Sequence, residues 1–357
     1  DGTKTYADVF RPAGDGKYPV LMTRTPYDKS SAASRSGPLD AINAASEGYA
    51  VVIQDVRGRY SSGGEFYTFV NETDDGFDSI EWAAEQSWAT GKVGMYGASY
   101  VGATQWLAAK SGAPSLAAIV PTVTASDYHE GWAWQGGSFE LGFNLSWSVG
   151  SLAHGNWNNL SDQLQLGNSA LEKLISSKDN LKPEFLHLPL SEMQVLKNGL
   201  APYYYDWLSH PEYDEYWQSL CIQDNHNKIQ IPALNIGGWH DIFLGGTIRN
   251  FTGMQSSGAN QSARDGQRLL LGPWVHGNTG TLAGSYNYGT SSSRDKENIH
   301  GRTLSFFDKW LKGDAGKESI DKSVRIFVMG INKWRDEEEW PLARAIDAKF
   351  YLHSNGG

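Results

Sequence analysis

Cysteine is nearly absent from this sequence, and so are long apolar runs. Cys221 is the single cysteine among 357 residues, which excludes an intrachain disulfide. Cysteine content therefore does not indicate whether the protein works in an oxidising or a reducing compartment. No run of 18 apolar residues occurs, so we expect no helix that spans a membrane. Because the chain starts at Asp1 rather than at Met, we expect its natural start to lie upstream, and a cytoplasmic and a secreted location both stay open.

Basic residues are too few to favour a polyanionic partner. Lys and Arg number 30 against 40 Asp and Glu, and the net charge of −10 argues against binding to nucleic acid or to an anionic membrane surface. No Cys/His cluster, P-loop or Rossmann fingerprint occurs, so we expect neither a metal nor an organic cofactor. A small-molecule substrate is the partner that remains, and a homo-oligomer stays open.

What the sequence does contain is an alternation of strand and helix patterns. Buried strands are predicted by apolar runs at 18–24, 49–55, 93–97 and 116–122, and helices by the patterns between them at 39–48, 74–86 and 100–112. This alternation is typical of a parallel, doubly wound α/β sheet. Strand patterns resume at 231–239, 267–274 and 324–330. The segment from about 125 to 225 has helical stretches such as 160–178 without matching strands, which indicates an inserted helical cap.

A serine stands where one of these strands meets a helix, in the stretch "VGMYGASYVGATQW". Gly97, Ser99 and Gly102 are spaced as G-x-S-x-x-G, whereas G-x-S-x-G is the commoner pattern of the α/β-hydrolase nucleophile elbow. A tight turn of this kind exposes the serine oxygen and needs small flanking residues. We therefore interpret Ser99 as a nucleophile; the alternative is an ordinary turn serine.

The elbow pattern predicts an acid and then a histidine, each just after a later strand. Asp241 follows the strand pattern in "NIGGWHDIF", and His276 follows the next one in "LLLGPWVHGN". His240 is a rival base, but side chains of adjacent residues diverge, so it is poorly placed if Asp241 is the orienting acid. The oxyanion would be bound by the N–H of Tyr100 and by a second donor from the loop at 25–29, for which the hydroxyl of Tyr27 is a candidate.

With these motifs, the sequence resembles the cocaine esterase and X-prolyl dipeptidyl-peptidase superfamily of α/β-hydrolases, which includes α-amino-acid ester hydrolases and glutaryl acylases. The segments that carry the resemblance include "PVLMTRTPYDK", "GYAVVIQDVRGRYSSGGEF", "VGMYGASYVGATQW", "GPWVHGN" and "VRIFVMGINKWRDEEEWP". The resemblance implies Ser99 as nucleophile, His276 as base, Asp241 as orienting acid, and Tyr27 and Tyr100 as the oxyanion hole. It also implies an acyl pocket lined by aromatic residues, with Trp132, Trp134, Trp147 and Phe243 as candidates.

The resemblance divides the chain into an α/β-hydrolase domain at 1–126 and 223–343 and a helical cap at 127–222. Members of the superfamily carry a C-terminal jelly-roll domain, and we expect 344–357 to be a stub leading to it. The implied activity is serine hydrolysis of esters or amides with an apolar or aromatic acyl group, without a cofactor. Ile242 and Phe243 stand where α-amino-acid ester hydrolases have acidic residues, which favours an apolar acyl group. An X-Pro dipeptidyl-peptidase or an acylase acting on amides is the alternative; for the former, Asp127, Glu130 or Glu140 would bind the substrate N-terminus.

Overall fold

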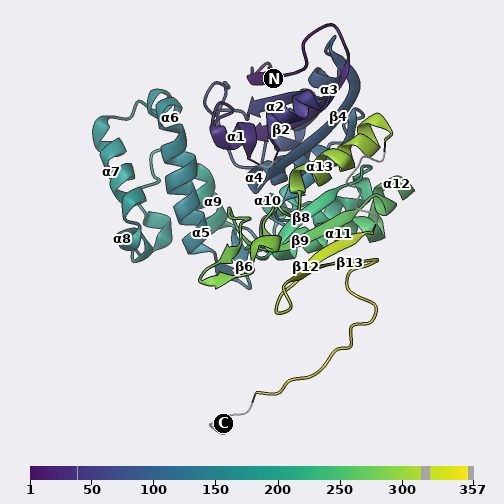
Figure 1. Ribbon diagram of the computed structural model, residues 1–357. Coiled ribbons are helices and arrows are strands. Elements are labelled where there is room, and N and C mark those ends of the chain that lie inside the picture. Colours follow the sequence, from purple (N-terminus) through teal and green to yellow (C-terminus); the bar gives the residue numbers. More distant parts are fainter. Residues whose placement is uncertain (38, 315–321, 353–357) are drawn as a thin grey trace.

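The protein is built on a nine-stranded sheet in the order β1-β3-β2-β4-β5-β8-β9-β12-β13 (Figure 1). The computed structural model describes residues 1–37, 39–314 and 322–352. The strands are β1 (Ala7–Phe10), β2 (Tyr18–Thr25), β3 (Ala50–Asp55), β4 (Ala89–Ala98), β5 (Leu116–Thr122), β8 (Leu234–His240), β9 (Arg268–Val275), β12 (Val324–Val328) and β13 (Lys333–Glu337). Strands β3 to β12 are parallel, as predicted, while β1 and β13 add antiparallel edges.

Helices cover both faces of this sheet because successive strand side chains point to opposite faces. One face packs against α3 (Glu72–Ala84), α4 (Tyr100–Lys110), α11 (Leu244–Ser257) and α12 (Gln261–Asp265). The other packs against α2 (Ala41–Ser46) and α13 (Ile299–Phe307), close to α1 (Ala32–Ser36). Val20 and Met22 thus belong to the first apolar core, whereas Leu21 belongs to the second. This layered arrangement confirms the predicted α/β fold class.

The chain between β5 and β8 forms a separate layer of helices beside the sheet, drawn in teal in Figure 1. It contains a hairpin of β6 (Trp134–Gln135) and β7 (Ser138–Phe139), the α-helices α5 (Leu141–Ser146), α6 (Trp157–Leu164), α7 (Asn168–Asp179), α8 (Lys182–Phe185), α9 (Pro202–Ser209) and α10 (Glu215–Leu220), and the π-helix η1 (Trp147–Ala153). Short 3-10 turns lie at η2 (His154–Asn156), η3 (Leu190–Glu192) and η4 (Gln223–Lys228). The single helical stretch expected at 160–178 is two helices, because Gln165 adopts a left-handed conformation with φ of 52° and ends α6.

The last part of the chain returns to the sheet and then leaves the body. Helix α13 continues as the π-helix η6 (Asp308–Lys312) and ends at Gly313 with φ of 77°. A small hairpin of β10 (Leu282–Ala283) and β11 (Tyr286–Asn287) and a 3-10 turn, η5 (Thr290–Ser292), precede α13. Of the expected stub at 344–357, residues 344–352 form an extended, exposed tail, and 353–357 lie outside the described residues. Within the described ranges, no helix has the length and apolarity needed to cross a membrane.

Candidate active site

Ser99 lies in a strained turn between β4 and α4, with φ of 61° and ψ of −124°. Both flanking glycines are required by close contacts. A Cβ on Gly97, which has φ of 142°, would lie 2.2 Å from Cγ1 of Val101. A Cβ on Gly102 would lie 2.8 Å from Cβ of Thr124. Val101, at the position where the commoner pattern has its second glycine, thus occupies the space beside Gly97, while Gly102 leaves room for Thr124. The strain is stored at the residue whose side chain must be exposed.

Three side chains from the carboxyl ends of β4, β8 and β9 form a continuous hydrogen-bonded chain. Nε2 of His276 lies 3.0 Å from Oγ of Ser99, and Nδ1 of His276 lies 2.8 Å from Oδ2 of Asp241. The other oxygen of Asp241 accepts the N–H of Phe243 at 2.7 Å, and the carboxylate is buried. With Nδ1 protonated toward the carboxylate, Nε2 is free to accept the serine proton. The structure therefore brings together the three residues predicted from the motifs.

The rival histidine points elsewhere. Nε2 of His240 lies 2.7 Å from the hydroxyl of Tyr288, in the loop that follows the β10–β11 hairpin. Asp241, the next residue, turns toward His276 instead. Adjacent side chains diverge here as the sequence analysis expected.

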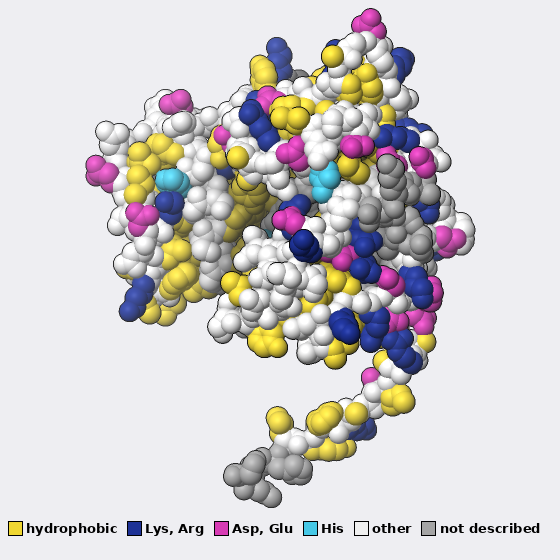
Figure 2. Space-filling view, viewed as in Figure 1, with side chains coloured by type: hydrophobic (Ala, Val, Ile, Leu, Met, Phe, Trp, Pro, Cys, Tyr) yellow, Lys and Arg dark blue, Asp and Glu magenta, His cyan; other side chains and the backbone are white. Residues whose placement is uncertain are grey.

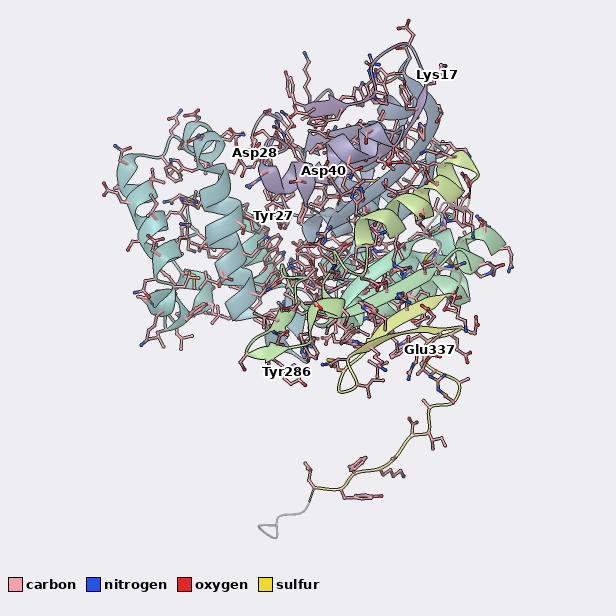
Figure 3. All side chains as sticks on the ribbon, viewed as in Figure 1. Lys17, Tyr27, Asp28, Asp40, Tyr286 and Glu337 are labelled. Atoms are coloured by element: carbon pink, nitrogen blue, oxygen red, sulfur yellow. The ribbon has the colours of Figure 1, made fainter. Side chains whose placement is uncertain are left out.

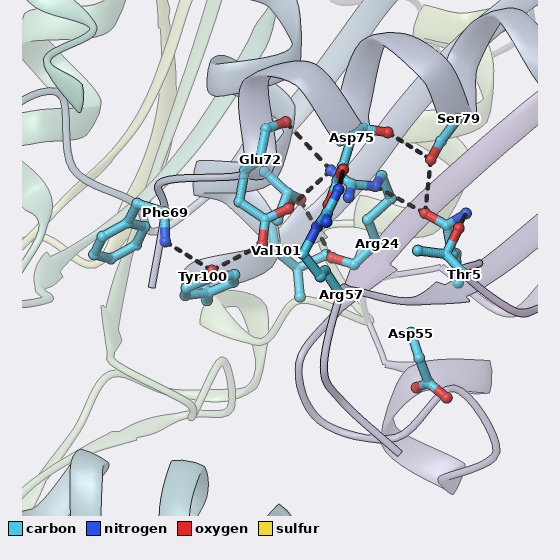
Figure 4. Close-up of polar contacts among 12 residues, drawn as sticks. Thr5, Arg24, Asp55, Arg57, Phe69, Glu72, Asp75, Ser79, Tyr100 and Val101 are labelled. Atoms are coloured by element: carbon cyan, nitrogen blue, oxygen red, sulfur yellow. Dashed lines mark hydrogen bonds and ion pairs between the residues drawn. The ribbon is translucent and has the colours of Figure 1, made fainter. Parts of the chain in front are cut away.

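The side chain of Tyr100 is anchored in a buried polar network behind the turn (Figure 4). Its hydroxyl donates to Oε1 of Glu72 at 2.8 Å and accepts the N–H of Phe69 at 2.9 Å. Oε2 of Glu72 pairs with Nη1 of Arg24 at 2.8 Å, and both residues are buried. Burial, with the nearby Glu72 carboxylate, raises the pKa of Tyr100 well above its ordinary value. The network holds the first residue of α4, whose main-chain N–H follows the serine.

Tyr27 follows β2 and lies between the cap and the α/β body (Figure 3). Its hydroxyl oxygen accepts the indole N–H of Trp147, a cap residue, at 2.9 Å. Burial raises the pKa of Tyr27 to about 12, so the phenol keeps its proton at neutral pH. Because the indole is the donor in this contact, the phenol hydrogen remains available for another acceptor.

Aromatic rings from the cap and from the loop after β8 pack beside the histidine. Trp132 stacks on Phe243 with ring centres 4.3 Å apart, and Phe243 meets the His276 ring edge-on at 5.1 Å. The ring centre of Trp147 lies 5.3 Å from that of Trp132. Trp134 lies apart from this cluster: its ring packs against Phe139 in the β6–β7 hairpin, and its N–H donates to a main-chain oxygen.

Further rings of the cluster were missed by the sequence analysis. Phe69 stacks on Tyr100 and on Tyr128, and Phe143 stacks on Trp147. No spacing rule connects residues so far apart along the chain. The unusual backbone conformation of Phe69, with a left-handed φ of 69°, could not be predicted from the sequence.

The described residues contain no group of three or more His, Cys, Asp or Glu side chains that could hold a metal ion.

The parallel sheet, the strained serine turn and the histidine and aspartate that follow later strands together define an α/β-hydrolase. The sequence matches the family of X-Pro dipeptidyl-peptidases (S15 family) over residues 1–278. The chain belongs to this family, which is a family of serine hydrolases.

A curated relative is similar in sequence, and solved structures share the fold. Cocaine esterase of Rhodococcus sp. (strain MB1 Bresler) is 35% identical over 359 residues, an alignment that covers 100% of this chain and 61% of the esterase. An aminopeptidase from the marine sediment archaeon Thaumarchaeota archaeon shares the fold with a TM-score of 0.69 at 20% identity, covering 96% of this chain and 57% of its own. An α-amino acid ester hydrolase shares the fold with a TM-score of 0.68 at 24% identity, and the match covers 95% of this chain and 57% of the hydrolase. The chain thus spans about three fifths of the length of the curated relative.

Proposed function

We propose that this chain is the catalytic part of a serine esterase that cleaves carboxylic esters with an apolar or aromatic acyl group through an acyl-enzyme. The observation that carries the proposal is the hydrogen-bonded chain from Ser99 through His276 to Asp241, with both contacts at 2.8–3.0 Å. This is the geometry in which an imidazole accepts the serine proton as the oxygen attacks a carbonyl. Membership of a serine hydrolase family supports the same assignment.

In the proposed reaction, His276 takes the proton of Ser99 while Oγ forms a bond to the carbonyl carbon. The buried carboxylate of Asp241 keeps the imidazole oriented and stabilises its protonated form. The negative oxygen is bound by the main-chain N–H of Tyr100 and by the hydroxyl of Tyr27. Each such donor contributes about 2.7–4 kcal/mol of transition-state stabilisation. His276 then gives its proton to the leaving group, and water repeats the two steps to release the acid.

Trp132, Trp147 and Phe243 are proposed to line the acyl side, because Phe243 packs against the His276 ring and Trp132 and Trp147 extend the same aromatic cluster. An apolar acyl group would find an aromatic wall there. Trp134 is the weakest of the four predicted pocket residues, since its ring packs into the β6–β7 hairpin instead.

The alternative, release of X-Pro dipeptides, needs an anion to bind the substrate N-terminus. The candidate Asp127 is buried, and its carboxylate already accepts the N–H of His129 and a side-chain N–H of Gln223. Glu130 accepts the N–H of Gly136 within the cap hairpin. These existing partners make Asp127 and Glu130 less suitable for this role, whereas Glu140, the third candidate, makes no side-chain cap to α5 in the described part of the chain; the test below therefore includes both substrates.

The test compares wild type with Ser99→Ala on p-nitrophenyl butyrate, a benzoate ester, a glutaryl anilide and Ala-Pro-p-nitroanilide. We expect hydrolysis of the esters by wild type and a loss of kcat of about 10⁴-fold or more in Ser99→Ala. Ser111→Ala is the matched control, because Ser111 ends the same helix and its hydroxyl donates to the main-chain oxygen of Ala108. Full activity in Ser99→Ala contradicts the assignment of the nucleophile. Cleavage of Ala-Pro-p-nitroanilide alone would establish the alternative.

A further inference from the structure

A cavity of about 420 Å³ lies on the side of the sheet opposite the aromatic cluster. Its deep walls are formed by Tyr96, Ile236, Trp274 and Ile299, which belong to the apolar core under α2 and α13. Ala33 of α1 lines it and is exposed, so it marks the mouth. Tyr27, which also lines the cavity, lies between the cap and the body, where Figure 2 shows a hollow with hydrophobic side chains. The volume falls within the range of natural small-molecule pockets, about 300–1,000 Å³.

The cavity lies next to the reacting groups, although neither Ser99 nor His276 is itself on its wall. Its lining includes Ala98, the residue before Ser99, and both chain neighbours of His276, namely Val275 and Gly277. Tyr27, the proposed oxyanion donor, lines it as well. This space is therefore adjacent to an ester bonded to Ser99, and the proposal below places one half of the ester in it.

A buried hydroxyl on the cavity wall has no partner. The Oη atom of Tyr96 makes no hydrogen bond with any residue in the described part of the chain, and the side chain is 1% exposed. Several buried polar atoms of the described residues lack a partner, the hydroxyls of Tyr128 and Tyr204 included, but among them the Tyr96 hydroxyl is the one whose residue lines this cavity, where a ligand could supply an acceptor. Tyr96 lies three residues before Ser99 on β4, about 10 Å along the strand. The end of a bound group that lies farthest from Ser99 would meet this hydroxyl.

We infer that this cavity is the leaving-group subsite, and that it accepts an apolar, ring-sized alcohol with a hydrogen-bond acceptor at its far end. The inference rests on the proposed function. A general acid must reach the atom that leaves, so the leaving group has to lie where His276 can protonate it. The chain on both sides of His276 walls the cavity, whereas the acyl half faces the rings of Trp132 and Phe243.

The first test narrows the mouth of the cavity with Ala33→Phe. Ala32→Phe is the matched control, because Ala32 is equally exposed on the same helix but does not line the cavity. Each variant is assayed on methyl acetate, 2-naphthyl acetate and methyl 2-naphthoate. For Ala33→Phe we expect kcat/KM to fall about tenfold or more on 2-naphthyl acetate and to stay within about twofold on the two methyl esters. Ala32→Phe should resemble wild type on all three.

Other outcomes overturn the inference. A loss on methyl 2-naphthoate with 2-naphthyl acetate spared would assign the cavity to the acyl half, and an equal loss on every ester would show no subsite. If wild type cleaves no ester and Ser99 is not labelled by a fluorophosphonate, the proposed function itself is wrong. This result differs from a failure of the subsite inference, in which wild type cleaves esters but Ala33→Phe does not discriminate among them as expected.

A second variant tests the hydroxyl. Tyr96→Phe removes the unpartnered Oη and keeps the ring, so the fold should be retained. We expect kcat/KM to fall about fivefold on 6-methoxy-2-naphthyl acetate and to be unchanged on 2-naphthyl acetate. Equal effects on both esters would contradict a contact between Tyr96 and the leaving group.

Discussion

The hydroxyl of Tyr100 donates a 2.8 Å hydrogen bond to Glu72, so the residue after the serine is tied to helix α3 through its side chain. Glu72 is in turn paired with Arg24 of β2, in a part of the molecule that water does not reach. Both ends of this network are buried, which makes each contact strong and each missing partner costly. We interpret Tyr100 as a residue with two parts: a main-chain N–H that faces the reaction and a side chain that fixes where this N–H lies.

The first prediction concerns this anchor. Tyr100→Phe removes the hydroxyl and leaves the N–H of Phe69 and an oxygen of Glu72 without their partner. We expect a loss of about 1–3 kcal/mol in the free energy of unfolding, measured by urea denaturation. We also expect kcat to fall while KM changes little, because the N–H acts in the transition state.

Tyr67→Phe is the control for this variant. The hydroxyl of Tyr67 donates to Asp206 at 2.6 Å, at the contact between cap and body, and makes no hydrogen bond to Tyr100 or Glu72 within the described residues. This variant should lose comparable stability and keep its kcat. If both variants lose stability and both keep kcat, the network is structural and does not position the oxyanion donor.

The second prediction concerns the strained turn. Gly97→Ala places a Cβ 2.2 Å from Val101 at a φ that L-residues avoid, so the turn must distort. We expect a loss of about 3 kcal/mol or more in the free energy of unfolding, together with a fall in kcat. Gly91→Ala, on the same strand with φ of 89° and nothing within 4 Å, isolates the backbone strain and should lose about 1 kcal/mol.

A double-mutant cycle of Gly97→Ala with Val101→Ala measures how much of the effect comes from the clash, because Val101→Ala removes the Cγ1 atom at 2.2 Å and leaves the Cβ of residue 101 at 2.9 Å. A favourable coupling of about 1–2 kcal/mol is expected. Additive effects of the two substitutions would mean that the contact with Val101 is not the reason why position 97 requires glycine.

Much of the fold and the triad could be predicted because local rules act there. Buried parallel strands appear in the sequence as continuous apolar runs, and the order of strand ends places Ser99, Asp241 and His276 at one edge of the sheet. The family and the α/β class, both predicted from motifs, are confirmed.

The rest could not be predicted, because it depends on contacts between residues far apart in the chain. Glu72 and Arg24 carry no signal of a shared buried pair, and Trp147 is 120 residues from the tyrosine that it contacts. Trp134 was grouped with Trp132 on resemblance alone, and a two-residue strand turns its ring into the β6–β7 hairpin instead. The edge strand β13 was missed because its residues are mostly charged and exposed.

The third prediction concerns alkaline pH. An unfolded tyrosine ionises near pH 10, whereas burial raises the pKa of Tyr27 to about 12 in the folded protein. Between these two values the unfolded chain has released a proton that the folded chain retains. The contribution of Tyr27 to stability is therefore complete below pH 10 and is lost as the pH rises from 10 to 12.

We expect the thermal unfolding temperature to fall steadily above pH 10, and less steeply in Tyr27→Phe than in wild type. Because the phenol stays protonated as a donor, kcat of wild type should be level between pH 8 and about pH 10. Tyr27→Phe should lower kcat about 10²–10³-fold at every pH in this range, as expected for the loss of one oxyanion donor. A decline of wild-type kcat with an apparent pKa near 9 that is absent in Tyr27→Phe would show that Tyr27 ionises during catalysis. It would then have to act through its charge and not as a hydrogen-bond donor.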